Sequence, residues 1–263
     1  MHVGPTELRA VRAGDALVRF AVLGDLTYVD AELPATGDLG PADQPCDRPH
    51  HGVVIDGGFA VERPDGPVPV EARTAFHVPG GAPPHRHRLE QAARILAFEP
   101  TGEDVSEAAL RRLGLIPVAR PPARPAAWSD PRPVAAPGRI EADFAVLGSW
   151  LLTIARFGRR GGFSSDYCDV AHWGTVLDGH VTIEWEDDVE LLGPGDVFHC
   201  EPGPPGHRVL AAEPATVLDI TPVEAVGGPG RLMPWRRIGF ERALQAARAV
   251  PREPGAMELA RVG

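Results

Sequence analysis

The sequence has few cysteines, no long apolar run and no excess of basic residues. Its 263 residues include three cysteines, an odd number that in a cytosolic chain indicates thiol or metal chemistry more readily than disulfides. No run of 18 apolar residues exists, which excludes a membrane-spanning helix on hydropathy grounds. Residues 1–20 lack the apolar segment of a signal peptide, so we expect a cytoplasmic protein.

Charge and composition limit the partners. The formal net charge is −10 and the pI is about 5.5, so the chain lacks the basic face that nucleic acid or an anionic membrane surface requires. The chain is 43% hydrophobic and 24% charged, which suits a globular protein with one large core or two modest ones. We therefore expect a small-molecule ligand or substrate, with a homodimer left open as the assembly.

An internal repeat organises the chain. At an offset of 122 residues, segment 46–57 aligns without a gap with segment 168–179, and the same register extends to residue 100 against residue 222. A self-match at a fixed offset indicates two copies of one domain. The predicted organisation is an N-terminal domain over 1–103, a helix and Pro-rich linker over 104–138, a C-terminal domain over 139–226 and a helical extension over 227–263.

Each copy has the pattern of an all-β domain. In the second copy, branched and aromatic runs at 175–177, 180–185 and 189–192 are separated by Asp-Gly, Asp-Asp and Gly-Pro-Gly-Asp turns. Short strands with such frequent turns are typical of a sandwich or barrel. Seven prolines within 117–137 predict an extended linker between the copies. Apolar residues at helical spacing within 239–250 predict a C-terminal helix.

Cysteine and histidine recur in register and predict a metal site in each copy. The repeated positions are Cys46, His50 and His85 in the first copy and Cys168, His172 and His207 in the second. A thiolate with two imidazoles suits Zn²⁺ or another borderline-soft divalent ion. Because alternate strand residues share one face, Asp166 can join Cys168 as a charged fourth donor; the first copy has Gln44 at this place. A cysteine buried as a small hydrophobe remains the alternative.

Further repeated or aromatic residues are candidates for the rest of the site. His77 and His199 also form a pair at the same offset, and they are candidates for proton transfer or additional ligation. A histidine hydrogen-bonded in the wall of a barrel explains them equally well. Trp173, Trp185 and Arg208 are candidates for the substrate pocket. Cys200 has no counterpart and is interpreted as a structural thiol.

The motifs resemble the cupin superfamily. The Val-Leu-Asp-Gly run at 176–179 resembles the hairpin that closes the first cupin motif. The Gly-Pro-Gly-Asp run at 193–196, followed by Pro202 and His207, resembles the second motif. The run Cys168-x-x-x-His172-Trp173-Gly174 is similar to small, uncharacterised bacterial cupins. The resemblance implies a bicupin, two jelly-roll barrels in tandem. This chain departs from the usual His-x-His and carboxylate of the first motif, which puts oxygen-activating iron in doubt and raises zinc.

The resemblance also implies an enzyme of specialised metabolism. The first hypothesis is a lyase, isomerase or cyclase that uses Zn²⁺ as a Lewis acid, with His199 or His77 moving the proton. An iron-dependent bicupin dioxygenase and a non-catalytic metal- or metabolite-binding module remain as alternatives. We expect the chemistry in the second copy, because that copy keeps the Gly-Pro-Gly-Asp turn, offers Asp166 and carries the two tryptophans.

Overall fold

The computed structural model describes residues 2–3, 8–36, 45–81, 84–101, 116–117, 140–158, 161–162, 167–185, 188–228, 234–249 and 255–262. They belong to two compact units. The N-terminal unit comprises Leu8–Pro121 and Arg252–Val262, and the C-terminal unit comprises Met1–Glu7, Pro122–Pro251 and Gly263. The predicted helix and almost all of the Pro-rich linker within 104–138 lie outside the described residues, as do Gln44 and Asp166.

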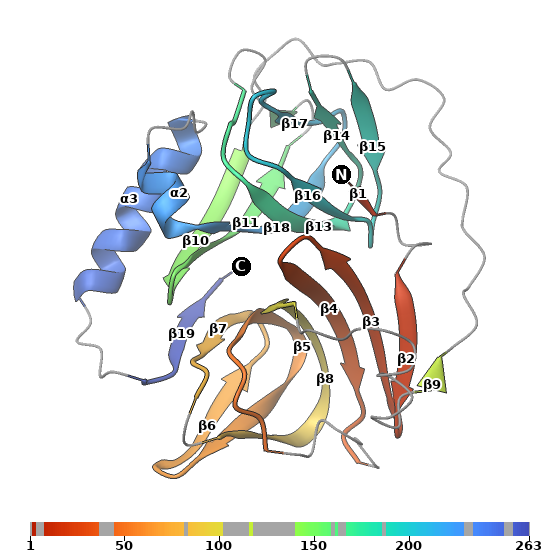
Figure 1. The fold of residues 1–263 in the computed structure, drawn as a ribbon, viewed down its shortest axis with the longest axis vertical. Coiled ribbons are helices and arrows are strands. Elements are labelled where there is room, and N and C mark those ends of the chain that lie inside the picture. Colours follow the sequence, from red (N-terminus) through yellow and green to blue (C-terminus); the bar gives the residue numbers. More distant parts are fainter. Residues whose placement is uncertain are drawn as a thin grey trace. The chain divides into compact units, whose positions relative to one another are not determined.

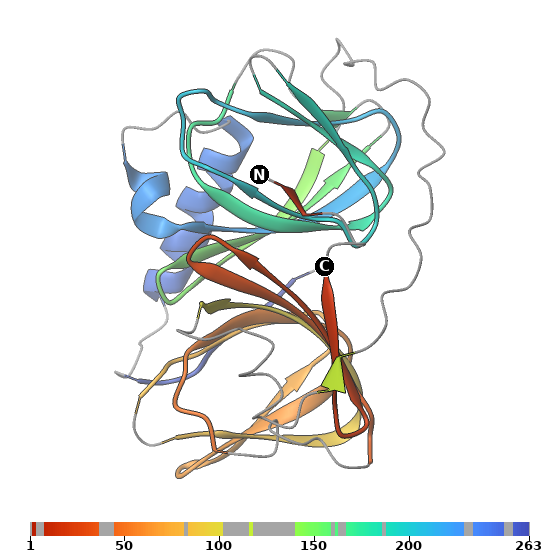
Figure 2. The ribbon, with the colours of Figure 1, turned by 45° about the vertical axis from the view of Figure 1, so that its right-hand side comes forward.

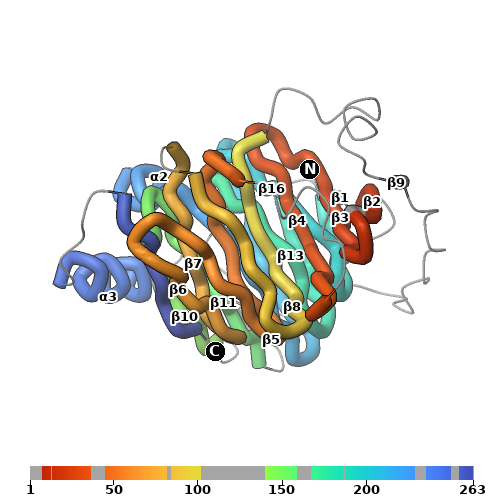
Figure 3. Tube along the Cα trace, turned by 90° about the horizontal axis from the view of Figure 1, so that it is seen from below, coloured from red at the N-terminus to blue at the C-terminus, as the bar shows by residue number. Residues whose placement is uncertain are grey.

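The N-terminal unit is built on one curved antiparallel sheet (Figure 1). The strand order is β19-β7-β5-β8-β4-β3-β2-β9, and β6 pairs with β5. Figure 3 shows β4, β8 and β5 side by side. The strands are β2 (Arg9–Ala13), β3 (Ala16–Leu23), β4 (Leu26–Leu33), β5 (His50–Arg63), β6 (Gly66–Glu71), β7 (Thr74–Val78), β8 (Arg86–Pro100), β9 (Ile116–Pro117) and β19 (Glu258–Arg261).

The long strands β5 and β8 bend where their pairing shifts. Register shifts occur between Val54 and Asp56 and between Gly57 and Phe59, and such irregularities increase the local bend and twist of a sheet. Gly57 has a φ of +69°, and a Cβ at this position would lie 1.7 Å from the backbone oxygen of Ala92. Glycine is therefore required here, and the bend lets β5 and β8 wrap around an apolar core that includes Phe59 and Phe76.

The C-terminal unit contains two antiparallel sheets, of orders β1-β16-β13-β18-β11-β10 and β12-β17-β14-β15 (Figure 2). Its core includes Val176 and Phe198 from the first sheet and Ile183 and Leu192 from the second. The strands are β1 (His2–Val3), β10 (Ile140–Leu147), β11 (Trp150–Phe157), β12 (Gly161–Gly162), β13 (His172–Asp178), β14 (Val181–Glu184), β15 (Val189–Leu192), β16 (Val197–Cys200), β17 (Arg208–Ala211) and β18 (Ala215–Pro222).

Two helices follow β18 in the C-terminal unit. These are α2 (Val223–Gly227) and α3 (Pro234–Ala249). The predicted C-terminal helix is thus present and begins earlier than expected, at a proline, which is well tolerated in a first turn. Phe240 of α3 packs in a cluster with Val146, Leu151 and Cys168. No helix within the described residues is both long and apolar enough to cross a membrane.

Each unit is completed by a strand from the opposite end of the chain. β1 pairs with β16, placing His2 opposite Phe198, and β19 pairs with β7, placing Leu259 opposite Phe76. β7 and β16 occupy corresponding places in the sequence repeat, so equivalent strand edges are covered in the same way. Covered edges protect a sheet from non-native pairing. The sequence did not predict these two short strands, which carry little periodic signal.

Deleting residues 256–263 is expected to lower the free energy of unfolding of the N-terminal unit by about 2–4 kcal/mol, because β19 loses its cross-strand hydrogen bonds, worth about 0.5–1.5 kcal/mol each. Urea unfolding of the purified proteins measures this. The control is Leu259→Ala, which keeps the backbone pairing and changes a side chain that is 42% exposed. Equal unfolding midpoints for the deletion and the wild type would show that β19 contributes nothing.

Candidate metal centres

Two clusters of one cysteine and two histidines occupy corresponding places in the two units. Within each cluster, one donor atom per residue can be chosen so that all lie within 4.8 Å of one another. The cysteine is held opposite one histidine by paired backbone hydrogen bonds, of 2.8 and 2.9 Å in the first cluster and 2.7 and 2.9 Å in the second. The other histidine begins the next strand. The clusters are Cys46, His50 and His85, and Cys168, His172 and His207.

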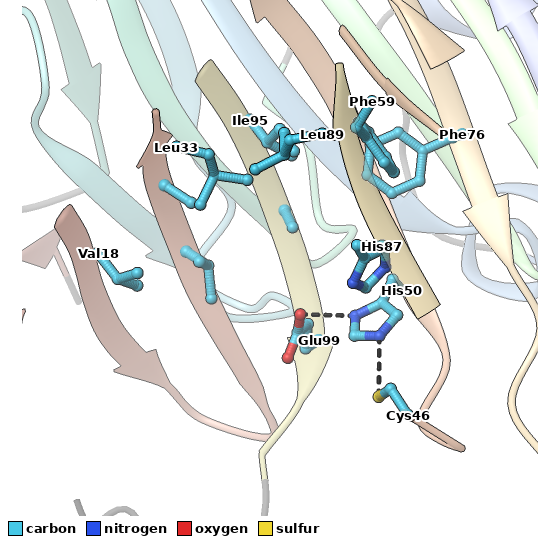
Figure 4. A pocket seen from close by; sticks show the side chains of 13 residues that line it. Val18, Leu33, Cys46, His50, Phe59, Phe76, His87, Leu89, Ile95 and Glu99 are labelled. Atoms are coloured by element: carbon cyan, nitrogen blue, oxygen red, sulfur yellow. Dashed lines mark hydrogen bonds and ion pairs between the residues drawn. The ribbon is translucent and has the colours of Figure 1, made fainter. Parts of the chain in front are cut away.

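The first cluster extends to a buried carboxylate. Cys46 Sγ lies 3.2 Å from His50 Nε2, and His50 Nδ1 lies 2.7 Å from Glu99 Oε1 on β8 (Figure 4). An ionised carboxylate only accepts hydrogen bonds, so His50 donates from Nδ1 and directs Nε2 toward Cys46. His85 is 2% exposed, and its Nε2 has no hydrogen-bond partner within the part of the chain that the structure describes.

Electrostatics favour an ionised first cluster. Burial alone would raise the pKa of Cys46, but interactions with His50, His85 and the backbone of Arg48 outweigh burial and lower the pKa to about 6. Burial opposes the charged form of His50, yet Cys46 and Glu99 raise its pKa to about 9. Burial likewise acts to raise the pKa of Glu99, and His50 lowers it below its usual value. At neutral pH Cys46 and Glu99 are therefore anionic and His50 is protonated, so these three groups together keep a net negative charge, which favours binding of a cation.

A cavity of about 270 Å³ opens beside this cluster. At one end lie Cys46, His50, His87 and Glu99 (Figure 4). Burial and the neighbouring His50 and His85 lower the pKa of His87 to about 3, so its ring is neutral at pH 7. The remaining lining is wholly apolar and is called the apolar wall below. It consists of Val18, Val29, Ala31, Leu33, Phe59, Phe76, Leu89, Ile95 and Ala97.

Sequence reasoning did not find His87 or Glu99. His87 follows His85 by two positions, and strand alternation places such residues on one face, so that signal was present. Glu99 aligns with Thr221 in the repeat. The repeat comparison highlighted only identical pairs, and it therefore passed over the one position where the two centres differ most in charge.

The second cluster lies deeper and borders an ion pair. Cys168 Sγ lies 3.0 Å from His172 Nε2, and His172 Nδ1 lies 2.6 Å from the Thr221 hydroxyl. Arg236 of α3 places Nη1 3.3 Å from the same His172 Nδ1 and 2.7 Å from Asp219 Oδ1. The Arg236 and Asp219 residues are 4% and 3% exposed. The buried cation of this unit is thus a guanidinium.

Arg236 changes the protonation of the second cluster. A guanidinium only donates hydrogen bonds, so His172 accepts at Nδ1 and keeps its proton on Nε2, directed at Cys168. Burial raises the pKa of Cys168, and burial together with Arg236 lowers the pKa of His172 well below its usual value. The same two causes lower the pKa of His207 to about 3. At neutral pH the second cluster therefore consists of a neutral thiol and two neutral imidazoles.

The structure does not bring His77 and His199 to either cluster. His77 stacks on His51 with ring centroids 4.2 Å apart, and His199 stacks on Trp173 at 4.6 Å. Both stacks are cross-strand pairs. Neighbouring residues along a strand point to opposite faces, so these rings lie on the far side of the sheet from His50 and His172. The roles of His77 and His199 in proton transfer and of Trp173 in a pocket stay predictions, and all three rings lie on the face away from the two clusters.

The other pocket candidates lie near the second cluster. The Trp185 ring lies 6.4 Å from that of His207, centroid to centroid, and packs against the core. Arg208 donates to the buried Glu184 with an Nε–Oε2 distance of 2.5 Å, and its guanidinium lies 5.0 Å from the centre of the Tyr167 ring. Arg208 is therefore already paired within the protein, and its role in a substrate pocket stays a prediction.

Comparison with known proteins identifies the fold. No protein-family model matches the sequence, and no curated protein matches it. Oxalate decarboxylase from Bacillus subtilis at pH 4.6 superposes with a TM-score of 0.55 at 13% identity, covering 84% of this chain and 76% of that one. AerE from Microcystis aeruginosa superposes with a TM-score of 0.52 at 9% identity, covering 85% and 99%. The predicted all-β, jelly-roll fold is confirmed.

Proposed function

We propose that the protein is a metal-dependent cupin enzyme for a small molecule, and that its working centre is in the N-terminal unit. The observation that carries the proposal is the convergence of Cys46, His50 and His85 beside a cavity whose polar end Cys46 and His50 line, with Glu99 behind His50. The proposal includes the tandem duplication inferred from the sequence, with barrels over 1–103 and 139–226 that the terminal strands complete.

The donor set suits a divalent ion. The unpartnered Nε2 of the buried His85 is the kind of polar atom that is costly to leave without a partner. One thiolate and two imidazoles correspond to the three protein ligands of a catalytic zinc site, which keeps a fourth position for water or substrate. Glu99 would act on the ligand His50 as carboxylates do behind metal-bound histidines, fixing the ring and its tautomer. We therefore propose Zn²⁺, with Fe²⁺ as the alternative.

The proposed chemistry is that of a lyase, isomerase or cyclase of specialised metabolism. A bound divalent ion would supply Lewis acidity to a carbonyl or enolate oxygen. The apolar wall would orient the carbon skeleton and exclude water from it. His87 lines the same end of the cavity as the centre, and its neutral imidazole is placed to form a hydrogen bond with the bound molecule.

The second centre is proposed to hold no cation. The guanidinium of Arg236 already places a positive charge 3.3 Å from His172 Nδ1. A divalent ion would have to bind beside this guanidinium, which does not lose its proton, whereas the positive charge at the first centre is a proton on His50 that a metal ion can displace. The C-terminal unit then serves as a scaffold, and the Arg236–Asp219 pair holds α3 against it.

Metal loading tests the proposal. Metal-free protein is incubated with excess ZnCl₂, or anaerobically with Fe²⁺, and desalted before metal analysis by mass spectrometry. We expect one zinc ion per chain in the wild type, nearly none in Cys46→Ala and one in the matched variant Cys168→Ala. Circular dichroism establishes that both variants are folded. Two ions per chain, or equal losses in the two variants, would contradict the assignment to the first centre.

A thiol catalyst is the second candidate. Cys46, His50 and Glu99 form a chain of 3.2 and 2.7 Å contacts, the arrangement of nucleophile, base and orienting group found in cysteine-dependent acyl transfer. A wild-type chain that retains no ion after loading, but is alkylated rapidly at Cys46 by iodoacetamide, would favour this reading. Retention of zinc with protection of Cys46 from alkylation supports the metal centre.

A further inference from the structure

The cavity of the N-terminal unit separates polar from apolar surface. All four polar side chains that line it lie at the end where Cys46 and His50 meet (Figure 4). The opposite end is formed by Leu33 of β4, Leu89 and Ile95 of β8 and the paired rings of Phe59 and Phe76, whose centroids lie 5.4 Å apart. A ligand that fills the cavity thus meets hydrogen-bonding groups at one end only.

The charges of the lining exclude a second anionic group on the ligand. Among the described residues that line the cavity there is no arginine or lysine, and Glu99 is itself an acid. One polar oxygen of the ligand can find a partner at the His50 end of the cavity. A second carboxylate would lie against the apolar wall without a partner, and an unpaired charge is strongly disfavoured in such surroundings. A small dicarboxylate therefore does not match this cavity.

The volume limits the size of the ligand. At the packing density of protein interiors, about 0.74, a cavity of about 270 Å³ accommodates roughly 200 Å³ of ligand van der Waals volume. This corresponds to a compact skeleton of one or two rings, or a branched hydrocarbon of similar bulk. Burial of such a skeleton contributes about 25 cal/mol per Å² of apolar surface.

We infer that the ligand is a neutral, compact hydrocarbon or aromatic skeleton that carries a single polar oxygen function, bound with that oxygen toward Cys46 and His50. The inference rests on the proposed function in one respect, which is the group that the ligand oxygen contacts. The match between the apolar wall and the skeleton holds with or without a metal ion. The proposal for the ligand class can therefore be wrong while the proposal for the metal centre is right, and the reverse is also possible.

Calorimetric titration with three probes tests the class. The probes are 2-naphthol, which is neutral and carries one hydroxyl, naphthalene, which has no polar group, and oxalate, a small dianion. Each is titrated into metal-free and zinc-loaded wild-type protein. We expect 2-naphthol to bind both forms, at least tenfold more tightly than oxalate in each, and naphthalene to bind more weakly than 2-naphthol to the zinc-loaded form.

Variants of the apolar wall locate the binding. Leu89→Arg introduces a cation beside the apolar wall and is expected to weaken 2-naphthol binding at least tenfold. Leu89→Trp fills the cavity without adding charge and is expected to do the same, which keeps the test valid if the arginine variant does not fold. The matched control is Leu259→Arg, on β19 of the same unit, where the side chain is 42% exposed; here binding should not change.

The outcomes separate the two proposals. Binding of 2-naphthol that is lost in both Leu89 variants supports the ligand class, even in a protein that retains no zinc. Oxalate that binds the zinc-loaded protein more tightly than 2-naphthol overturns the ligand class and leaves the metal centre intact. Binding of 2-naphthol that is unaffected by either Leu89 variant also overturns it, because the molecule would then bind elsewhere.

Discussion

Arg236→Met is expected to lower the free energy of unfolding of the C-terminal unit by about 3–5 kcal/mol, the usual cost of removing one partner from a buried ion pair. The reason is that Asp219, which is 3% exposed, keeps its charge in the interior without the guanidinium that now contacts both of its oxygens. Methionine fills much of the volume of the arginine side chain, so the loss reports mainly the charge. Urea unfolding at pH 7, followed by far-ultraviolet circular dichroism, measures it.

Two further proteins make the interpretation specific. The double variant Asp219→Leu/Arg236→Met removes both charges and is expected to recover most of the stability. Arg94→Met breaks the pair with Asp30, in which the arginine side chain is 46% exposed, and should cost no more than about 1 kcal/mol. An Arg236→Met protein as stable as Arg94→Met would show that the buried pair does not hold α3 in place.

The same double variant also tests the proposal that Arg236 keeps a metal ion out of the second centre. Without Arg236, the Thr221 hydroxyl can accept the Nδ1 proton of His172, because a hydroxyl both donates and accepts. His172 Nε2 is then free for a metal ion beside Cys168. We therefore expect the double variant to retain two zinc ions per chain after loading, against one for the wild type.

The fold was largely predictable because the strand and turn signals of the second copy could be transferred to the first copy through the repeat. Strands around Cys168 and His172 are flanked by turns with strong local signals, and Asp196 accepts a 2.6 Å hydrogen bond from the backbone of Gly193 in the Gly-Pro-Gly-Asp turn. The terminal strands β1 and β19 were not predictable. Their place depends on the free edges of β16 and β7, which exist only in the folded units.

The copy that the sequence favours as the working centre differs from the copy that we propose. The sequence favoured the second copy for its Gly-Pro-Gly-Asp turn, but that turn shapes a hairpin and contributes no side chain to the cluster. Arg236 could not be foreseen, because α3 lies outside the repeat and its partner Asp219 aligns with the apolar Ala97. The contrast between Glu99 and Thr221 was visible in the sequence. Its meaning required knowing that both residues contact the same nitrogen of their histidines.

Glu99→Gln is expected to weaken zinc binding about 10- to 100-fold, the usual effect of removing a carboxylate behind a metal-bound histidine. The glutamine amide can keep the 2.7 Å contact with His50 Nδ1, so the position of the ring is retained and the negative charge is lost. Competition with a chromogenic zinc chelator gives the dissociation constant for wild type and variant.

The matched control is Thr221→Val, which removes the hydroxyl at the corresponding place in the C-terminal unit. If the first centre alone binds the ion, this variant should leave zinc affinity and content unchanged, although the buried His172 loses a hydrogen bond of 2.6 Å and stability falls by about 1–3 kcal/mol. Zinc affinity in Glu99→Gln within twofold of the wild type would show that the carboxylate only packs against His50. Loss of zinc in Thr221→Val, with Glu99→Gln unaffected, would move the working centre to the second unit.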